Sequence, residues 1–263
     1  MMSRLKYSLK YIQYVLYSKH KKGHGIHSPF MFGLIKNVFN KRTLNKDLKK
    51  IFIVHDKYKR SKQILKYNEI GAGSAYKRKN DQSIGEIVKC SSISKKYGKL
   101  IYNLINYFTP INILELGSSV GISSAYIGQA AKESSFISIE GVNEKLEVAK
   151  EIANELNHST KFICADFDNS LNSVLNNFEQ LDFVFFDGNH TKESTIKYFE
   201  SCLHKIHNNT IFIFDDIHWS SEMEEAWKYI KSSKEVIVSV DLFRMGLIFF
   251  RKELSYEHYT IKY

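Results

Sequence analysis

Acidic and histidine side chains gather where two apolar runs in the second half of the chain end. One run closes with FFDGNH (185–190) and another with FDDIHW (214–219), so that three carboxylates and two histidines follow buried segments. Buried strand ends seldom collect so many ionisable groups without a pairing partner, a metal or a substrate. Carboxylate oxygens suit magnesium, manganese or calcium, whereas imidazoles also admit zinc or iron. The pattern predicts one polar rim that contains Asp187, His190, Asp215, Asp216 and His218.

A second set of candidate residues follows three earlier apolar runs. The first run ends in the glycine-rich turn ELGSSVG (115–121), and the second ends in Glu140-Gly141, 25 residues after Glu115. Glycines let a backbone approach a ligand closely, and a carboxylate at the second strand end can accept hydrogen bonds from a ribose diol. The third run ends in Asp166-Phe167, where the acid suits an adenine amino group and the ring suits stacking. Together these turns predict a nucleoside-cofactor site.

Each of these signals has a simpler structural interpretation. The turn at 115–121 lacks the full G-x-G-x-x-G spacing of dinucleotide binders. Asp166 is also what the first turn of a helix favours. A competing glycine-rich segment, EIGAGS (69–74), follows no buried strand, so we interpret Gly71 to Ser74 as a loop; a loop that covers the site is the alternative.

The elements that must position these residues begin after Pro110. Runs rich in β-branched and aromatic residues alternate with helical patterns, at 111–116, 135–140, 160–164, 181–187, 210–215, 235–240 and 246–251. Such alternation predicts an α/β fold of the Rossmann-like, doubly wound type, with a mostly parallel seven-stranded sheet. The last two strands are too close for a crossover helix, so they should form a C-terminal antiparallel hairpin. The S-x-x-E pattern from Ser221 to Glu224 predicts a capped helix start just beyond Trp219.

The first part of the chain is helical in pattern and strongly basic. Residues 1–100 hold 24 basic and 5 acidic side chains, whereas residues 101–263 hold 14 basic and 23 acidic. Helices are expected at 3–20, 30–40, 44–66, 83–90 and 94–107, with Pro29 at the first position of the second and a polar loop at 67–82. The helix at 3–20 is amphipathic and basic, which fits packing on the domain or attachment to nucleic acid or an anionic membrane surface. We expect a basic helical region at 1–96, a cofactor-binding domain at 97–255 and a tail at 256–263.

Cysteine usage and hydropathy limit the class of protein. The three cysteines, Cys90, Cys164 and Cys202, form no C-x-x-C pair, which argues against a disulfide framework and a zinc site. No apolar run reaches the length of a secretory signal core or a membrane span. A cytoplasmic location is the simplest expectation.

The site segments resemble those of class I S-adenosylmethionine-dependent methyltransferases, in particular the catechol and caffeoyl-CoA O-methyltransferase-like branch. The matching segments are ELGSSVGIS (115–123), SIEG (138–141), ADF (165–167), FFDGNH (185–190) and FDDIHW (214–219). The resemblance covers roughly 97–252. The segments GHGIHSPF, GAGS and DDIHWS also resemble a group of bacterial predicted methyltransferases.

The resemblance implies a role for each matched position. Glu115, Gly117, Ser118, Ser119 and Gly121 would hold the methionine and ribose part of S-adenosylmethionine. Glu140 with Gly141 would bind the ribose hydroxyls, Asp166 and Phe167 would border adenine, and Asp187 would complete the cofactor site. Asp187, Asp215 and Asp216 would ligate a divalent cation such as Mg²⁺, although the branch has Asp-Asn where this chain has Asp215-Asp216. His190 stands where the branch has a proton-abstracting lysine, so His190 and Asp187 are the expected catalytic residues, with an unperturbed histidine pKa near 6.5.

The expected function is methyl transfer to an unidentified acceptor, most simply a hydroxyl group of a small molecule or glycan. A nucleic-acid methyltransferase is the nearest alternative and has the basic residues 1–100 in its favour, although no RNA-binding motif or base-methylation signature accompanies them. A non-catalytic S-adenosylmethionine-binding scaffold on a membrane surface is the alternative from another class. The sequence leaves the oligomeric state open.

Overall fold

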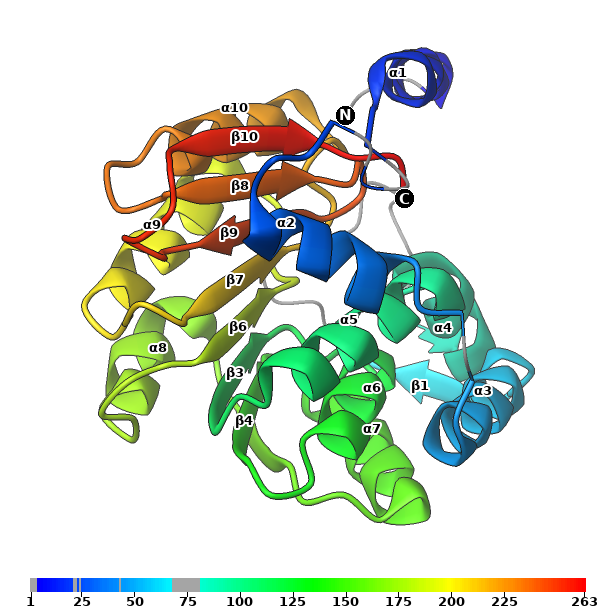
Figure 1. The fold of residues 1–263 in the computed structure, drawn as a ribbon. Coiled ribbons are helices and arrows are strands. Elements are labelled where there is room, and N and C mark those ends of the chain that lie inside the picture. The colour runs from blue at the N-terminus through cyan, green and yellow to red at the C-terminus, as the bar shows by residue number, and fades with distance from the viewer. Residues whose placement is uncertain (1–3, 21–22, 24, 43, 68–80) are drawn as a thin grey trace. The chain divides into compact units, whose positions relative to one another are not determined.

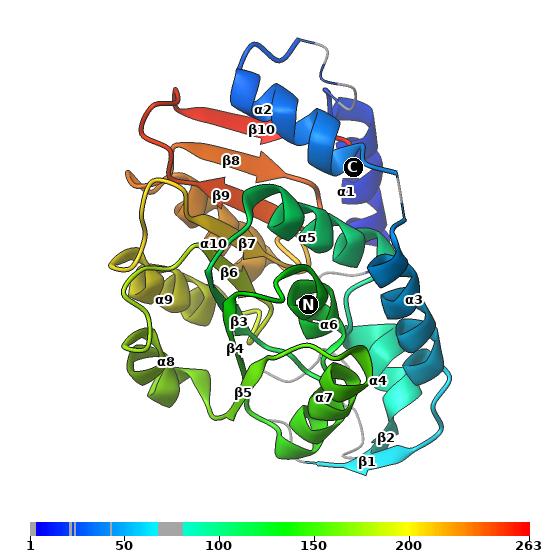
Figure 2. The same ribbon diagram turned by 60° about the horizontal axis from the view of Figure 1, so that its bottom comes forward.

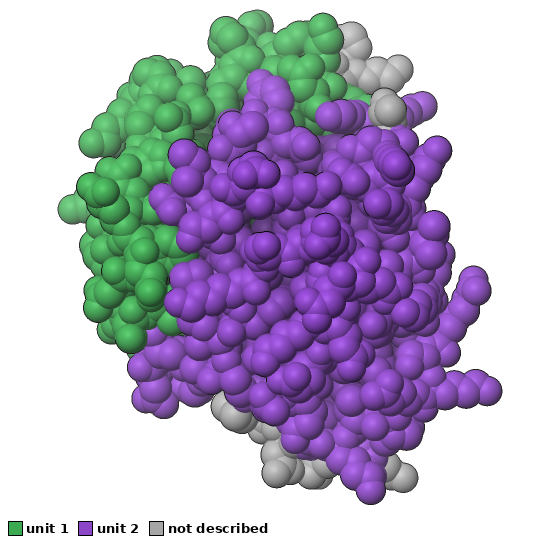
Figure 3. All heavy atoms as spheres, turned by 90° about the horizontal axis from the view of Figure 1, so that it is seen from below, with its two compact units in different colours: residues 1–40, 171–263 green, residues 41–170 purple. Residues whose placement is uncertain are grey.

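A computed structural model describes residues 4–20, 23, 25–42, 44–67 and 81–263. The chain divides into two compact units, which Figure 3 colours separately. Unit 1 comprises residues 1–40 and 171–263, and unit 2 comprises residues 41–170. The N-terminal segment thus shares a unit with the C-terminal strands, whereas residues 41–96 belong to unit 2. The glycine-rich segment 69–74 lies outside the described residues, so its expected loop stays a prediction.

Unit 2 consists of a parallel strand layer with helices packed on it. Its strands β3 (Asn112–Leu116), β4 (Ser135–Glu140) and β5 (Lys161–Cys164) pair in that order. The helices α5 (Lys95–Phe108), α6 (Ile122–Ala130) and α7 (Asn143–Leu156) follow one another in contact, and α7 packs on β4 and β5 (Figure 2). The register aligns Leu116 with Ile139 and Glu140 with Cys164. The carboxyl ends of the three strands therefore lie at one edge, where the predicted cofactor residues begin.

The remainder of unit 2 is built from α3 (Lys46–Lys59), α4 (Ile84–Ser91) and a small antiparallel pair, β1 (Ile64–Lys66) with β2 (Asp81–Ser83). Local sequence explains where the helices begin. The Asn45 side chain accepts from the Leu48 amide at the start of α3, and Ser83 and Glu86 form a reciprocal capping box at the start of α4. The helix α8 (Phe167–Leu175) follows β5 and crosses the boundary between the units.

Unit 1 carries five further strands in the order β10-β8-β9-β7-β6. Their bounds are β6 (Phe183–Phe186), β7 (Ile211–Phe214), β8 (Val238–Asp241), β9 (Gly246–Phe249) and β10 (Glu257–Thr260). Strands β6 and β7 are parallel, β9 runs antiparallel to β7 and β8, and β10 is parallel to β8. The helices α9 (Lys192–Leu203) and α10 (Ser221–Lys231) cover one face, and α2 (Pro29–Leu34), continued by a π-helical turn at Ile35–Phe39, lies on the other (Figure 1 and Figure 2).

These elements confirm the mostly parallel, doubly wound α/β fold and its hairpin β8–β9. Two details differ from the expectation. The described residues contribute eight strands to the sheet where seven were expected, because β10 pairs with β8 inside the segment expected to be a tail. The cap of α10 is Ser220, whose Oγ accepts from the Met223 amide at 3.1 Å; Ser220 has extended backbone angles, whereas Ser221 is already helical.

Helix α1 (Arg4–Tyr17) packs in unit 1 through a polar and aromatic face. Tyr14 is buried, donates from its hydroxyl to the Ile261 carbonyl at 2.5 Å and accepts from the Tyr263 amide. The apolar side chains Leu9, Ile12 and Leu16, which repeat at helical spacing, are 53%, 53% and 72% exposed. The sequence therefore indicated the helix but not the face by which it packs.

No helix of the described residues is long and apolar enough to cross a membrane.

Candidate functional site

The glycine-rich turn after β3 brings three backbone positions into left-handed conformations. Gly117 and Gly121 have φ angles of 98° and 84°, and Ser119 between them has a φ of 48°. A Cβ atom on Gly121 would lie 2.6 Å from the Cα of Ala149 in α7, so α6 and α7 can approach one another only because this residue has no side chain. The turn thereby places the start of α6 directly beyond the β3 strand end.

Glu115 is fully buried beneath this turn. Its Oε2 atom accepts hydrogen bonds from the hydroxyl groups of Ser124 and Ser138. Burial raises the pKa of this carboxyl group above its usual value, while the serine hydroxyls oppose that rise. Its second oxygen, Oε1, has no partner among the described residues.

Glu140 links the first two strand ends through its carboxylate. Its Oε2 atom accepts from the Ser119 amide at 2.8 Å, and its Oε1 atom accepts from the Val142 amide at 3.0 Å. Each carboxylate oxygen can accept more than one hydrogen bond, so the side chain retains acceptor sites for a diol. Gly141, between these contacts, is half-buried and accepts a weak bond from the thiol of Cys164 at 3.8 Å.

The polar atoms of the turn fit a bound cofactor. Glu115 Oε1, Ser118 Oγ and Ser119 Oγ are all buried and have no hydrogen-bond partner among the described residues. Buried polar groups in folded proteins are nearly always hydrogen-bonded, and a cluster of exceptions calls for a ligand or ordered water. Three of the residues assigned to the methionine and ribose part of S-adenosylmethionine therefore have unused hydrogen-bonding capacity.

The third strand end offers a more ambiguous pair of residues. The Asp166 Oδ1 atom accepts from the amide and the side chain of Asn169 at 3.2 and 3.1 Å, which is the helix-starting role that the sequence also allowed. Phe167 is buried as the first residue of α8. A place for these two residues beside adenine stays a prediction.

In unit 1, Asp187 and His190 form an ion pair just beyond β6. The His190 Nε2 atom lies 3.4 Å from the Asp187 Oδ1 atom. Burial and the neighbouring charge of Asp215 raise the pKa of Asp187 to about 7. Burial alone would lower the pKa of His190, but its bond to Asp187 and the nearby carboxylates raise it to about 9. In this pair the imidazole is therefore held in its cationic form, unlike a histidine with the unperturbed pKa near 6.5.

The carboxylates beyond β7 are paired with an arginine that sequence reasoning missed. Arg244, in the turn between β8 and β9, contacts Asp215 with two nitrogens, Nε to Oδ1 at 3.1 Å and Nη2 to Oδ2 at 2.9 Å. Its Nε atom also lies 3.5 Å from the Asp216 Oδ1 atom. Only an excess of acids at the rim could have signalled a compensating cation, and nothing in the spacing pointed to this residue.

This pairing does not fit the divalent cation that the resemblance implied. Both oxygens of Asp215 face the guanidinium, whose positive charge already compensates this carboxylate and repels a second cation from it. Across the described ranges, no group of three or more His, Cys, Asp or Glu side chains has an arrangement that could hold a metal ion. The donor set Asp187, Asp215 and Asp216 is therefore not a metal site in this structure, and we assign no chemistry to a metal there.

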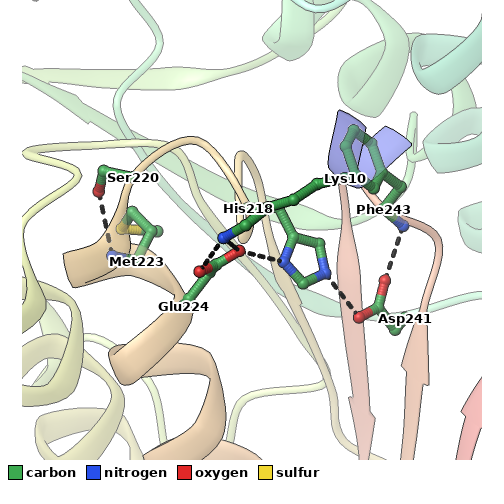
Figure 4. A network of polar contacts seen from close by, with 7 residues as sticks. All are labelled: Lys10, His218, Ser220, Met223, Glu224, Asp241 and Phe243. Carbon is green, nitrogen blue, oxygen red and sulfur yellow. Dashed lines mark hydrogen bonds and ion pairs between the residues drawn. The ribbon is translucent and has the colours of Figure 1, made fainter. Parts of the chain in front are cut away.

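His218, the second histidine expected at the rim, belongs to another network (Figure 4). Its Nε2 atom lies 2.8 Å from the Asp241 Oδ2 atom, and its Nδ1 atom lies 3.2 Å from the Glu224 Oε1 atom. Lys10 of α1 forms an ion pair with the same Glu224. Although burial opposes it, contact with the two acids raises the pKa of His218. These residues fasten α1 to the elements that follow β7.

Comparison with known proteins finds a family model that matches part of the chain. Residues 114–217 match the family profile described as a methyltransferase domain. No curated protein sequence matches the chain. The matched range includes the turn after β3 and the strand ends at Glu140 and Asp166. It also includes Asp187 and His190 after β6, and Asp215 and Asp216 after β7.

Several solved structures share the fold at low sequence identity. The O-methyltransferase TomG from Streptomyces achromogenes, solved with SAM, aligns with a TM-score of 0.57 and 15% identity, over 95% of this chain and 100% of its own. The SAH-bound methyltransferase PaMTH1 from Podospora anserina aligns with a TM-score of 0.58 and 12% identity, over 81% and 91%. The O-methyltransferase from Bacillus cereus, in complex with SAH, aligns with a TM-score of 0.56 and 14% identity, over 80% and 93%. Residues 114–217 thus match a methyltransferase domain, and the chain has the fold of these solved methyltransferases.

Proposed function

We propose that the chain transfers the methyl group of S-adenosylmethionine to a hydroxyl group of a small molecule. The observation that carries the proposal is the set of buried polar atoms without partners at the turn after β3, which lies within the matched methyltransferase domain. Two proteins of similar structure are O-methyltransferases that were crystallised with SAM or SAH.

Unit 2 supplies the residues that bind the cofactor in this proposal. Glu115, Ser118 and Ser119 hold its amino-acid end, and the backbone of Gly117 and Gly121 shapes the turn around it. Glu140 accepts from the ribose hydroxyls while its bonds to Ser119 and Val142 keep the carboxylate in place. Gly141 lies with Glu140 at the ribose, and Asp166 and Phe167 border the adenine ring. Bound S-adenosylmethionine supplies a methyl group that its sulfonium already activates.

Asp187 and His190, which follow β6, are the catalytic residues in this proposal. The Asp187 carboxylate would accept the proton of the acceptor hydroxyl when that oxygen takes the methyl group from S-adenosylmethionine. His190 donates to the Asp187 Oδ1 atom and so fixes the direction of the carboxylate. Orientation of two reactants typically contributes about 7–11 kcal/mol of barrier reduction, so the chain's main task is to hold the acceptor in line.

Calorimetry and methyl labelling test the proposal. Titration should show that S-adenosylmethionine binds, and S-adenosylmethionine labelled with tritium in the methyl group should label a small-molecule fraction of a cell extract. His190→Ala should bind the cofactor as the unmodified protein does and lose turnover. His207→Ala is the matched control, because its histidine pairs with Asp182 at 2.8 Å elsewhere in unit 1. Absence of cofactor binding, or equal turnover by both variants, would contradict the proposal.

The acceptor class is tested in the same labelling experiment. The basic residues 1–100 keep a nucleic-acid or anionic membrane partner as a prediction, and the comparisons add nothing in its favour. Label in a nuclease-sensitive fraction, together with binding that weakens steeply with salt, would assign the activity to nucleic acid instead.

A further inference from the structure

Arg244 is built into the chain as a fixed positive charge at the carboxylate cluster. It lies in the short connection between β8 and β9, and its carbonyl accepts from the Ile217 amide at 3.2 Å. The same connection is closed by the bond from the Leu242 amide to the Met245 carbonyl at 2.9 Å and by the bond from the Phe243 amide to the Asp241 side chain at 2.7 Å. The backbone that carries the guanidinium is therefore held in place on both sides.

The planar guanidinium of Arg244 makes a two-point contact with the buried carboxylate of Asp215. Asp215 has no exposed side-chain surface, and its two oxygens face two nitrogens of Arg244. Such paired contacts are the strongest form of charged hydrogen bond, and a guanidinium keeps its proton in proteins. A divalent cation that needed the Asp215 oxygens would have to displace this contact.

Part of the guanidinium is left for a ligand. The bonds to Asp215 and Asp216 use the Nε and Nη2 atoms, and the Nη1 atom has no partner in the described part of the chain. A quarter of the side chain is exposed, so these remaining donors are within reach of a bound molecule. Asp187 and Asp216 lie close enough for their charges to act on Arg244, which puts the proposed proton acceptor in the same cluster.

We propose that Arg244 takes the place of a divalent cation, and that its Nη1 group binds the acceptor oxygen. Methyl transfer by this chain then proceeds without a divalent metal. The contact between Nη1 and the acceptor oxygen rests on the proposed function. The replacement of a divalent cation by Arg244 depends only on the folded chain. The two parts have separate readouts, so failure of one is distinguishable from failure of the other.

Binding of Mn²⁺, followed by electron paramagnetic resonance of the free ion, tests the replacement without reference to turnover. The unmodified protein should leave millimolar Mn²⁺ unbound. Arg244→Ala should bind Mn²⁺, because removal of the guanidinium leaves the Asp187, Asp215 and Asp216 carboxylates uncompensated. Arg251→Ala is the matched control, since it removes an arginine whose partner Glu253 is half-exposed. Tight binding of Mn²⁺ by the unmodified protein at the cost of the Arg244–Asp215 contact would overturn the proposal.

Turnover tests the acceptor contact. Activity of the unmodified protein should persist in EDTA and be unchanged by added Mg²⁺. Arg244→Lys keeps the charge but not the fork, and its turnover should fall by about 100-fold or more, the usual effect of losing one oriented donor, while the cofactor dissociation constant changes less than threefold. The double variant Asp215→Asn/Arg244→Gln removes both charges and guards against a fold defect from an unpaired acid. Loss of activity in EDTA, or full activity in Arg244→Lys and the double variant, would refute the inference.

Discussion

Replacement of Gly121 by alanine tests how the turn after β3 is built. The added Cβ would lie 2.6 Å from the Cα and 2.7 Å from the Cβ of Ala149, far inside the usual carbon–carbon contact of about 3.5–4.0 Å. Both neighbours are part of α7, and one is its backbone, so rotation of a side chain cannot relieve the overlap. The helices α6 and α7 have to separate, or the turn has to move.

The size of the effect has two contributions. The φ angle of 84° costs a residue with a Cβ about 1–2 kcal/mol relative to glycine. Forced overlap in a packed interior adds about 1–3 kcal/mol. We therefore expect Gly121→Ala to lower the free energy of unfolding by about 2–5 kcal/mol, against a typical total of 5–15 kcal/mol. Because Ser119 lies in the same turn, cofactor affinity should fall as well.

Gly25→Ala is the matched control. Gly25 has a φ of 75°, but its nearest neighbour would be the Cε1 atom of the His20 side chain at 3.5 Å, an ordinary contact. The control therefore contains the backbone strain without the overlap. Urea unfolding followed by circular dichroism gives the free energies of unfolding. Both tryptophans, Trp219 and Trp227, lie in unit 1, so their fluorescence does not report on α7. Hydrogen exchange of α7 amides localises the change instead. If the two variants lose equal stability and α7 exchange is unchanged, the close approach of the helices does not explain this glycine.

Three further outcomes are expected. Glu140→Gln should weaken cofactor binding about 10-fold or more in calorimetry with little change in melting temperature, because an amide cannot accept from both the Ser119 and Val142 amides; unchanged affinity would argue against the ribose role. Burial lowers the pKa of His55 and His158 to about 4, so below pH 6.5 the unfolded chain binds more protons than the folded chain does. The free energy of unfolding, measured in urea, should therefore fall by about 2 kcal/mol per histidine between pH 7 and pH 5. His158→Gln should make this fall smaller. Lys10→Ala should speed amide exchange in α1 while changing global stability by less than about 1 kcal/mol, since its ion pair with Glu224 is partly exposed; unaltered exchange would show that this contact does not fasten the helix.

The sheet and the strand-end acids could be predicted because both depend on local pattern. β-branched and aromatic runs bury on both faces of a parallel sheet, and each run stops where a polar side chain must leave the core. Asp187, Asp215 and Glu140 were found on this rule, and the structure places each directly at the end of its strand. Strand β10 was not predicted, because it lacks a continuous run of buried apolar residues and alternate residues in it are exposed. Its pairing with β8 at the sheet edge leaves no local signal in the sequence.

The electrostatic character of the site could not be predicted in the same way. The charge state of His190 depends on acids from two different strand ends, and Arg244 reaches Asp215 across 29 residues of sequence. His218 shares the rim motif but bonds to Glu224 and Asp241. Spacing tells which residues stand at a strand end, whereas pairing depends on distances that only the folded chain fixes.

The two ends of the polypeptide are tied to one another in unit 1. Tyr14 donates to a carbonyl 247 residues further along, and Lys19 forms an isolated bridge with the same Ile261. At ~5–20 residues per second of translation, the first helix waits roughly 12–50 s for its partner to leave the ribosome. During synthesis that helix has to stay soluble without its partner. An affinity tag fused to either terminus would lie near the contacts of Tyr14 and Lys19 with Ile261.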